Sequence, residues 1–380
     1  MIRGARGEQR DGRAAVLARS PRIGVWPPLP PGVWLRRPAR RLPFPLEEPG
    51  CRLLAWGRHG LWRGATALGI GSGDGVLTSA YHHGSEVEAL ERTGARCSFY
   101  EGTPDLEPEE DELDALIDSG TRALHLTHFF GFPQDAARWR RFCDSRGLLL
   151  IEDGAQAWLA HRDGHPVGSH GDLAIFCLYK TFGLPEGATM LMRDPARSAP
   201  LDRRPGALAL ARKHAAWAAG RSATVTRLTE PFRRTSAFDP ARDRSLRDPE
   251  AMPWSTTRFL LRRVADDGAA TRWRANYGVL LDALGGSVSP GFRRLPPGAS
   301  PFLLPVETID KARMLEHLRR QGIEALDVWS SPHPSLPVER FPRTAVRRAR
   351  TVGLPVHQEL LPRDVDRMVS ALSGYSGDGP

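Results

Sequence analysis

The sequence predicts an α/β fold with a large, mainly parallel sheet and a smaller C-terminal α/β domain. Strand-like and helix-like segments alternate from Cys51 to about residue 193, which is typical of a parallel sheet covered by helices. Two continuous apolar runs, 148–151 and 173–178, indicate buried strands of that sheet. With 380 residues, the chain is long enough for two subdomains. Ligands of such sheets lie at the carboxyl ends of the strands.

The predicted elements follow in chain order. Residues 1–45 are rich in Arg and Pro, so we expect a poorly ordered basic leader and an extended arm. Strands are predicted at 52–56, 75–80, 96–100 and 121–128, and helices at 57–68, 84–93, 108–118 and 134–146. Residues 195–257 are less informative, with helix-like pieces at 205–220 and 222–234. A helix at 272–284, a strand at 300–307, a helix at 310–322 and a closing helix within 354–372 follow. We therefore expect a large domain at 46–257, a small domain at 258–373 and a tail at 374–380.

Composition restricts the class of protein. The formal net charge is +9, but no aromatic-interleaved basic stripe is present, so we expect a solvated basic surface and no nucleic-acid partner. No apolar run is long enough to span a bilayer, and residues 1–22 lack the apolar segment of a signal peptide. The four cysteines lie far apart without CxxC pairs, so we expect no metal site and a reducing, cytoplasmic location.

Lysine is scarce in this chain and therefore informative. Among 53 basic residues, only Lys180, Lys213 and Lys311 are lysines, and Lys180 alone ends an apolar strand. An amine can be deprotonated and attack a carbonyl to give a Schiff base, whereas Arg stays protonated. Asp153 ends the other apolar run, and an amine with a carboxylate is what pyridoxal phosphate requires. We expect Lys213 and Lys311 to face solvent. On spacing alone, an Asp–Lys ion pair at a sheet edge is an equally good interpretation.

Four segments resemble the DegT/StrS-type sugar aminotransferases: EDGAQAW at 152–158, HPVGSHGD at 165–172, AIFCLYK at 174–180 and PEGA at 185–188. The resemblance implies a pyridoxal-phosphate-dependent transferase of fold type I. It assigns Lys180 to the Schiff base, Asp153 to the pyridine nitrogen and Gln156 to the ring hydroxyl. The family serine is Cys177 here, only three residues before Lys180. Ala188 replaces the second glycine of the family's G-E-G-G.

Two further positions are assigned to the cofactor. Gly57, Arg58 and His59 follow the first strand and open a helix, where backbone N–H groups bind phosphate well. In the resembling family this turn reads S-G-T, and only Gly57 matches; an ordinary strand–helix turn is the alternative. His83 falls where the family stacks an aromatic residue on the pyridine ring, with Tyr81 as the second candidate. A surface histidine pair in a turn would explain His83 equally simply.

The resemblance also implies an activity. Family members transfer an amino group from an amino acid, often glutamate or glutamine, to a keto sugar or cyclitol ketone, and they act as homodimers. Ser255, Thr256 or Arg258 would then be candidates for contacts from a partner subunit. Two alternatives stay open: another pyridoxal-phosphate reaction on the same fold, such as dehydration, or a non-catalytic binding or regulatory protein. We expect His128, His333 and His357 to be structural.

Overall fold

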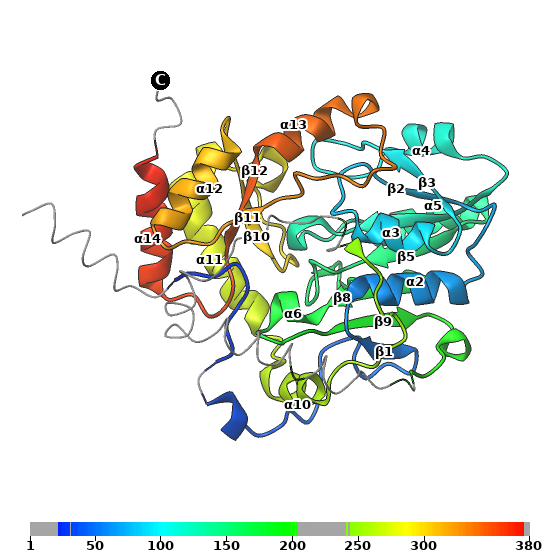
Figure 1. Cartoon of the computed structure of the whole chain (residues 1–380), viewed down its shortest axis with the longest axis horizontal. Coiled ribbons are helices and arrows are strands. Elements are labelled where there is room, and N and C mark those ends of the chain that lie inside the picture. The colour runs from blue at the N-terminus through cyan, green and yellow to red at the C-terminus, as the bar shows by residue number, and fades with distance from the viewer. Residues whose placement is uncertain are drawn as a thin grey trace, which may run out of the picture.

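The computed structural model describes residues 22–30, 32–201 and 244–375, and also residues 203, 211 and 241. The expected leader up to residue 21, nearly all of the helix-like pieces at 205–220 and 222–234, and the last five residues lie outside these ranges. A large α/β body carries the central sheet, and a smaller body lies beside it (Figure 1). Within the described residues, no helix combines the length and the apolar character needed to cross a membrane.

The central sheet has seven strands in the order β1-β9-β8-β5-β4-β2-β3. Their bounds are β1 Cys51–Leu54, β2 Gly75–Ser79, β3 Arg96–Tyr100, β4 Thr121–Thr127, β5 Leu149–Asp153, β8 Leu173–Cys177 and β9 Ala188–Met192. β3, β2, β4, β5 and β8 are parallel neighbours. β9 runs antiparallel to both β8 and β1. The predicted mainly parallel sheet is confirmed.

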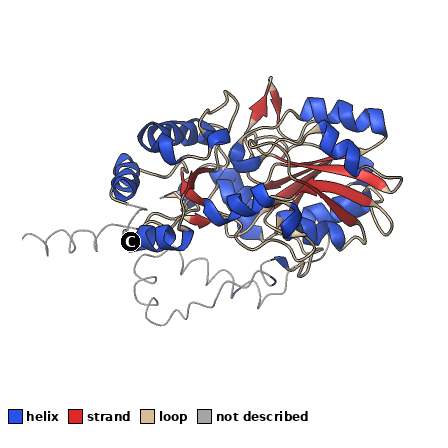
Figure 2. Cartoon of the chain, turned by 90° about the horizontal axis from the view of Figure 1, so that it is seen from above, coloured by secondary structure: helices blue, strands red, loops and turns tan. Residues whose placement is uncertain are grey.

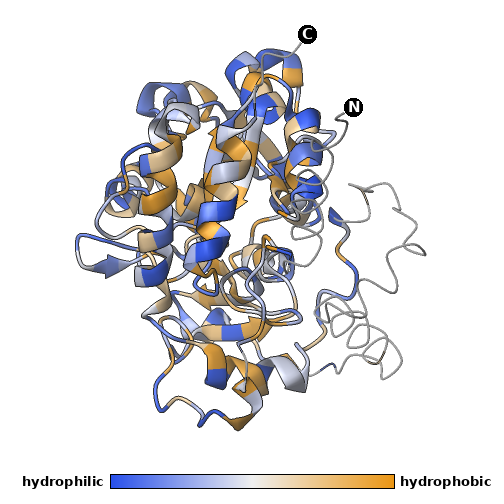
Figure 3. Ribbon diagram, turned by 90° about the vertical axis from the view of Figure 1, so that its left-hand side faces the viewer, coloured by the Kyte–Doolittle hydropathy of each residue, from blue (hydrophilic) through white to orange (hydrophobic). Residues whose placement is uncertain are grey.

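Helices cover both faces of this sheet (Figure 2). α2 (Gly57–Ala67) and α3 (Ser85–Glu91) pack on one face. α5 (Ala136–Arg146) packs on the other, next to α4 (Glu110–Leu116). The ends of α5 follow from local chemistry: the Asp135 side chain accepts from the Arg138 N–H at the start, and Gly147 at φ 66° ends the helix. Figure 3 shows apolar and polar residues alternating around the helices, as expected for elements with one buried side.

Strand geometry selects the side chains that face α2 and α3. Successive residues of a strand point to opposite faces of a sheet. Ile151 and Ile175 pack with α2 in one hydrophobic cluster, so Asp153 and Cys177, two residues further along their strands, lie on the same face. The same alternation places His125 of β4 there, because Ala123 belongs to that cluster. Polar side chains are thus collected at the carboxyl edge of the sheet.

The connections around the site are short. η2 (Phe129–Gly131) follows β4, the two-stranded ribbon of β6 (His161–Arg162) and β7 (His165–Pro166) follows β5, and α6 (Leu178–Thr181) follows β8. η3 (Pro195–Arg197) follows β9, and α10 (Ser255–Val264) packs through Leu260 and Leu261 on the cluster that contains Phe176 of the large sheet.

The small body is built on a three-stranded antiparallel sheet in the order β10-β12-β11. Its strands are β10 (Leu303–Glu307), β11 (Leu326–Asp327) and β12 (Thr351–Pro355). Its helices are α11 (Ala269–Leu284), α12 (Lys311–Arg320), α13 (Pro342–Arg350) and α14 (Pro362–Ser373), with short turns η5 (Gly285–Ser287), η6 (Pro290–Phe292) and η7 (Val338–Arg340). One apolar cluster joins this sheet to Phe129 and Phe130 of the large body. The two bodies therefore share a packed seam.

The N-terminal arm is extended and docks on both bodies. Its one helical turn is η1 (Val33–Leu35), which contacts α10. Near its start, the Ile23 N–H donates to the Gly322 carbonyl and the Glu324 N–H donates to the Ile23 carbonyl. This pairing adds residue 23 to the small body as a bridge opposite Ile323.

Candidate active site

A cavity of about 1110 Å³ lies at the carboxyl edge of the central sheet. Its walls come from the ends of β5 and β8, the start of α2, the turn before α3, residues 302–303 and 326–331 of the small body, and the arm. Such an edge is the usual ligand position in an open α/β sheet. Asp153, Gln156, Cys177, Lys180, Gly57, Arg58 and His83 all line it.

Lys180 reaches the cavity from α6, the single helical turn that follows β8. Burial alone would lower the pKa of its amine, but nearby acidic groups, among them Cys177, Asp153 and Glu86, raise it, and the net direction is upward. Burial also raises the pKa of the Cys177 thiol, so that thiol is neutral near pH 7. Asp153 and Glu86 are the carboxylates that contribute to this upward shift of the Lys180 pKa.

Asp153 is held from behind by a buried histidine that the sequence interpretation missed. The Asp153 carboxylate accepts a hydrogen bond from the Ala155 N–H at 2.8 Å. His125 Nε2 lies 3.4 Å from Asp153 Oδ2, and His125 Nδ1 lies 3.0 Å from Thr78 Oγ1. The His125 side chain is fully buried, so only the far side of the Asp153 carboxylate faces the cavity. This arrangement suits a carboxylate that receives a ligand N–H.

Glu152, the neighbouring acidic residue, has a different role. Its side chain is fully buried on the opposite face of the sheet and accepts from the N–H groups of Gly168, His170 and Gly171. His128 Nε2 lies 3.1 Å from its Oε2. Every oxygen of Glu152 is engaged within the protein, so Glu152 fixes the loop after β5. The expected structural role of His128 agrees with this contact.

Gln156 is oriented by the backbone of a strained turn. Its Oε1 accepts a hydrogen bond from the Phe130 N–H at 2.9 Å. The Nε2 amide group therefore remains to donate hydrogen bonds to a ligand. Phe130 has φ 54°, a left-handed conformation that is costly for a side chain of this size. The Phe302 N–H donates to the Phe130 carbonyl and ties the turn to the small body. The predicted contact of Gln156 with the cofactor hydroxyl stays a prediction.

The start of α2 places Gly57 and Arg58 on the cavity, as expected for a phosphate site. A Cβ at Gly57 would lie 2.8 Å from Cys177 Sγ, so the close approach of helix and strand requires glycine. No side chain caps the helix start. Arg58 donates from Nε to the Ser245 carbonyl at 3.1 Å and packs over the Trp56 ring. His59 is only 2% exposed and does not line the cavity, so the geometry favours Arg58 over His59 for this contact.

His83 lies at the turn before α3 and faces the cavity, whereas Tyr81 is fully buried against Trp329. The His83 and Gly84 N–H groups donate to the Glu86 carboxylate at 3.0 Å. This contact fixes the backbone that carries His83. Stacking of His83 on a cofactor ring stays a prediction.

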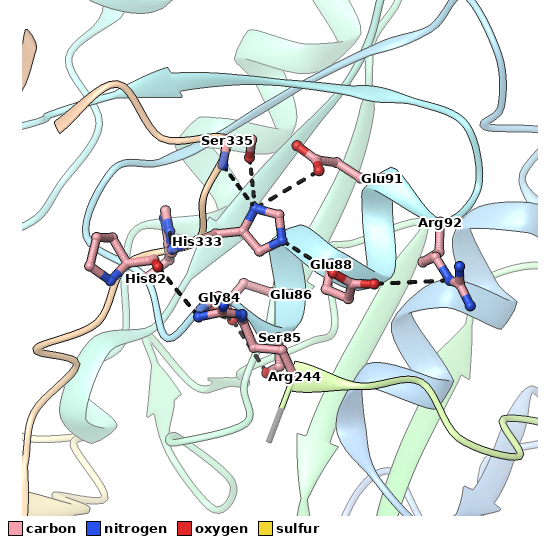
Figure 4. Close-up of polar contacts among 11 residues, drawn as sticks. His82, Gly84, Ser85, Glu86, Glu88, Glu91, Arg92, Arg244, His333 and Ser335 are labelled. Carbon is pink, nitrogen blue, oxygen red and sulfur yellow. Dashed lines mark hydrogen bonds and ion pairs between the residues drawn. The ribbon is translucent and has the colours of Figure 1, made fainter. Parts of the chain in front are cut away.

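Polar contacts connect this turn to the small body (Figure 4). His82 Nδ1 donates to the Ser79 carbonyl, so its Nε2 is free to accept from the His333 N–H at 3.2 Å. Burial is the first cause that lowers the pKa of His82, to about 3, which keeps this acceptor neutral. His333 Nε2 lies 3.2 Å from Glu88 Oε2 on α3. From the sequence, we expected local hydrogen bonds in a turn to satisfy His333. In the structure, His333 instead contacts the large body through His82 and Glu88.

The expectation that Lys311 faces solvent is wrong. Its side chain is 9% exposed, and burial lowers its pKa. Its Nζ donates to the Val328 and Arg348 carbonyls and pairs with Asp327. The helical pattern suggested a surface position, but Lys311 is the first residue of α12, and its amine reaches the carbonyls of Val328 and Arg348. Lys213 lies outside the described residues. Ser255, Thr256 and Arg258 form the start of α10 and do not line the cavity.

Fold and site together define a class of protein: an α/β protein of fold type I whose cavity presents an aspartate from the end of β5 and a lysine from the helical turn that follows the neighbouring strand β8. Residues 54–202 match the model of the DegT/DnrJ/EryC1/StrS aminotransferase family. The matched segment covers less than half of the chain and holds Asp153 and Lys180.

Three proteins illustrate the similarity. An L-glutamine:2-deoxy-scyllo-inosose aminotransferase of Streptomyces kanamyceticus is 30% identical over 194 residues, 49% of this chain and 45% of that protein. A dTDP-3-amino-3,4,6-trideoxy-alpha-D-glucose transaminase of Streptomyces venezuelae is 35% identical over 139 residues, 34% of this chain and 35% of that protein. Both matches cover less than half of the relative's length. NtdA of Bacillus subtilis, solved with bound cofactor PMP, shares the fold with a TM-score of 0.59 at 14% identity, over 85% of this chain and 72% of NtdA.

Proposed function

We propose that this chain is a pyridoxal-phosphate-dependent aminotransferase. It would take the amino group of an amino acid, glutamate or glutamine, and transfer it to a ketone on a sugar or cyclitol ring. One observation carries the proposal: Asp153 at the end of β5 and Lys180 in the helical turn after the neighbouring strand β8 line the same cavity. The two named relatives act on a cyclitol ketone and an amino sugar, and NtdA binds the amine form of the cofactor.

The residues of the cavity fit pyridoxal phosphate by their chemistry. When bound, this cofactor supplies an aldehyde for the donor amine and a ring that accepts electrons while its nitrogen is protonated. Asp153, fixed by His125, would hold that N–H. Arg58 and the uncapped start of α2 would bind the phosphate.

Lys180 would bind the aldehyde of the cofactor and would move the proton of the donor's α-carbon. Asp153 would direct part of its charge to the ring N–H of the bound cofactor, so the Lys180 amine, whose pKa Asp153 raises, would be easier to deprotonate. The Lys180 Nζ would then take the proton from the α-carbon of the donor. Cys177 occupies the place of the family serine, and its buried thiol contacts the same pocket.

Borohydride reduction followed by peptide mapping tests the proposal. The purified chain supplied with pyridoxal phosphate should give a pyridoxyl adduct on Lys180, and Lys180→Ala should give none. Lys213→Arg is the control and should keep the adduct. An adduct on Lys213 or Lys311, or no adduct at all, would contradict the catalytic assignment and favour the non-catalytic binding protein.

We also propose that the chain works as a homodimer in the cytoplasm, as the resemblance to the family implies. The four separated cysteines support a reducing compartment. Light scattering of the cofactor-loaded protein at micromolar concentration should report twice the chain mass. A monomer that retains amino transfer would contradict the dimer.

A further inference from the structure

Trp26, on the N-terminal arm, is exposed and yet firmly placed. Its side chain lines the cavity and stays 38% exposed, although large aromatic residues are usually more buried. The backbone just before it is fixed by the pairing of Ile23 with the small body and by His357 Nε2, which donates to the Gly24 carbonyl at 3.1 Å. A tryptophan held at a cavity with an open face is suited to contact a ligand.

Trp26 belongs to an aromatic wall, which we define as Trp26, Trp56, Tyr179 and Phe302. The ring of Trp26 lies 5.3 Å from that of Phe302 and 6.0 Å from that of Tyr179. The Trp56 and Tyr179 rings are 5.3 Å apart. All four residues line the cavity, although they come from the arm, the start of α2, α6 and the segment before β10. The wall is therefore assembled from distant parts of the chain.

The aromatic wall stands beside the reactive amine. Tyr179 precedes Lys180 in α6, and Lys180 Nζ lies 5.7 Å from the centre of the Phe302 ring. In the proposed reaction the carbonyl of the acceptor must reach the position of that amine. The part of the acceptor next to the wall is therefore the part that bears the carbonyl, and not a remote substituent.

The cavity also has polar lining residues. Ser85, Glu86, Arg244, Asp327, Ser330 and Ser331 line it, and we call them the polar rim. A saturated ring has hydroxyl groups at its edge and C–H bonds on its faces, so it matches a cavity lined by both aromatic rings and polar side chains. An open-chain keto acid has no such face.

We propose that Trp26 is a specificity-determining residue that binds the C–H face of the ring ketone, while the polar rim receives the hydroxyl or phosphate groups of the acceptor. This inference rests on the proposed function and adds a substrate contact outside the segment that matches the family, since Trp26 precedes residue 54. Covering one face of a six-membered ring with an indole corresponds to roughly tenfold in affinity. Phe at this position would keep much of that contact.

Titration calorimetry on the cofactor-loaded full chain tests the role of Trp26. Two ring probes, 2-deoxy-scyllo-inosose and a dTDP-linked keto-6-deoxyhexose, separate a free cyclitol from a nucleotide-linked sugar, and 2-oxoglutarate is the open-chain probe. Trp26→Ala should weaken binding of the better ring probe roughly tenfold and leave 2-oxoglutarate unchanged. Trp26→Phe should lose less affinity for this ring probe than Trp26→Ala. Trp34→Ala is the matched control, because Trp34 lies on the same arm but stacks on Phe259 outside the cavity, and it should behave as the wild type.

A separate measurement distinguishes failure of the proposed function from failure of the role of Trp26. Loss of near-visible cofactor absorbance on adding glutamine or glutamate without acceptor reports the donor half of the reaction, and the control Trp34→Ala should leave it unchanged. If that half-reaction fails in the wild type, the proposed function fails, and calorimetry still reports on Trp26. Equal ring affinity in Trp26→Ala and wild type, an equal loss for 2-oxoglutarate, or no ring probe bound by the wild type would overturn the role of Trp26.

Discussion

His125 determines what the Asp153 carboxylate can do, because it occupies one side of that carboxylate from within the sheet. His125→Phe keeps the volume of the ring but removes the Nε2 atom that lies 3.4 Å from Asp153. We expect cofactor affinity to fall roughly tenfold, because the Asp153 carboxylate loses the polar contact that supports it from within the sheet. The measurement is a titration of the near-visible absorbance with pyridoxal phosphate. His161→Phe, an exposed histidine on β6, is the control, and equal affinity in both variants would rule out this role.

Residue roles were only partly accessible from the sequence. The resemblance to the family selected Asp153 over Glu152 as the cofactor ligand. The structure explains this difference, because Glu152 faces the other side of the sheet and its carboxylate accepts hydrogen bonds from three backbone N–H groups. His125 was missed because it lies within an apolar strand, where a single polar residue carries no local signal. Strand alternation combined with Thr78 on β2 would have been the only clue. Lys311 was misplaced because its burial depends on contacts between distant elements.

At the scale of elements, the start of α2 carries the predicted phosphate contact. Arg58→Ala should weaken cofactor affinity by about 1.5–3 kcal/mol, or roughly ten- to a hundredfold, because a charge-assisted hydrogen bond is lost. Arg63→Ala is the matched control on the same helix; among the described residues, Arg63 donates to the Ala199 and Pro200 carbonyls. Equilibrium dialysis with pyridoxal phosphate gives both constants. Equal constants would exclude Arg58 from the phosphate site.

The docking of the arm should depend on pH through His357. Burial is the first cause that lowers the pKa of His357, from 6.5 to about 4. Below pH 6.5 the unfolded chain binds a proton at this position that the folded chain does not bind until about pH 4, so stability falls as the pH falls through this window. Between pH 7 and pH 5 the loss is on the order of 1–2 kcal/mol.

His357→Gln tests this window, because an amide can still donate to the Gly24 carbonyl but does not titrate. Denaturant unfolding at pH 7 and pH 5 should show a smaller loss of stability in the variant than in the wild type. The same loss in both proteins would assign the pH dependence to other groups.

Elements were predicted well where the hydrophobic pattern is long or regular, and less well elsewhere. The strand at 96–100 has the bounds predicted for it, and α2, α3 and α5 start within two residues of their predicted positions. β9 and β12 were missed. β9 begins at the last residue of the PEGA motif, and this segment was interpreted through that motif and not as a strand. β12 was absorbed into the closing motif because its partners β10 and β11 are remote in sequence.

At the scale of the whole molecule, Arg348 joins the two bodies. Its guanidinium is buried and donates to the carbonyls of Ala80 and His82 on the large body and of Trp329 on the small one. Arg348→Met should destabilise the protein by on the order of 3 kcal/mol, because it leaves buried carbonyls without donors. Arg343→Met, on the same helix, removes an exposed ion pair with Glu101 and should cost less than about 1 kcal/mol. Chemical unfolding of both variants measures these changes in the free energy of unfolding. Equal losses of stability would show that the seam does not depend on Arg348.

The aromatic wall has a consequence for the order of folding. Trp26 and Phe302 touch, so this contact closes a loop that contains the entire large sheet, and closure of such a loop is entropically costly and slow. During synthesis the N-terminal arm leaves the ribosome long before its docking partners around residues 302, 323 and 357 exist. The sheet with Asp153 and Lys180 can therefore form first, while the acceptor side of the cavity closes only when the chain is nearly finished. A nascent chain would accordingly bind its cofactor before it could distinguish between acceptors.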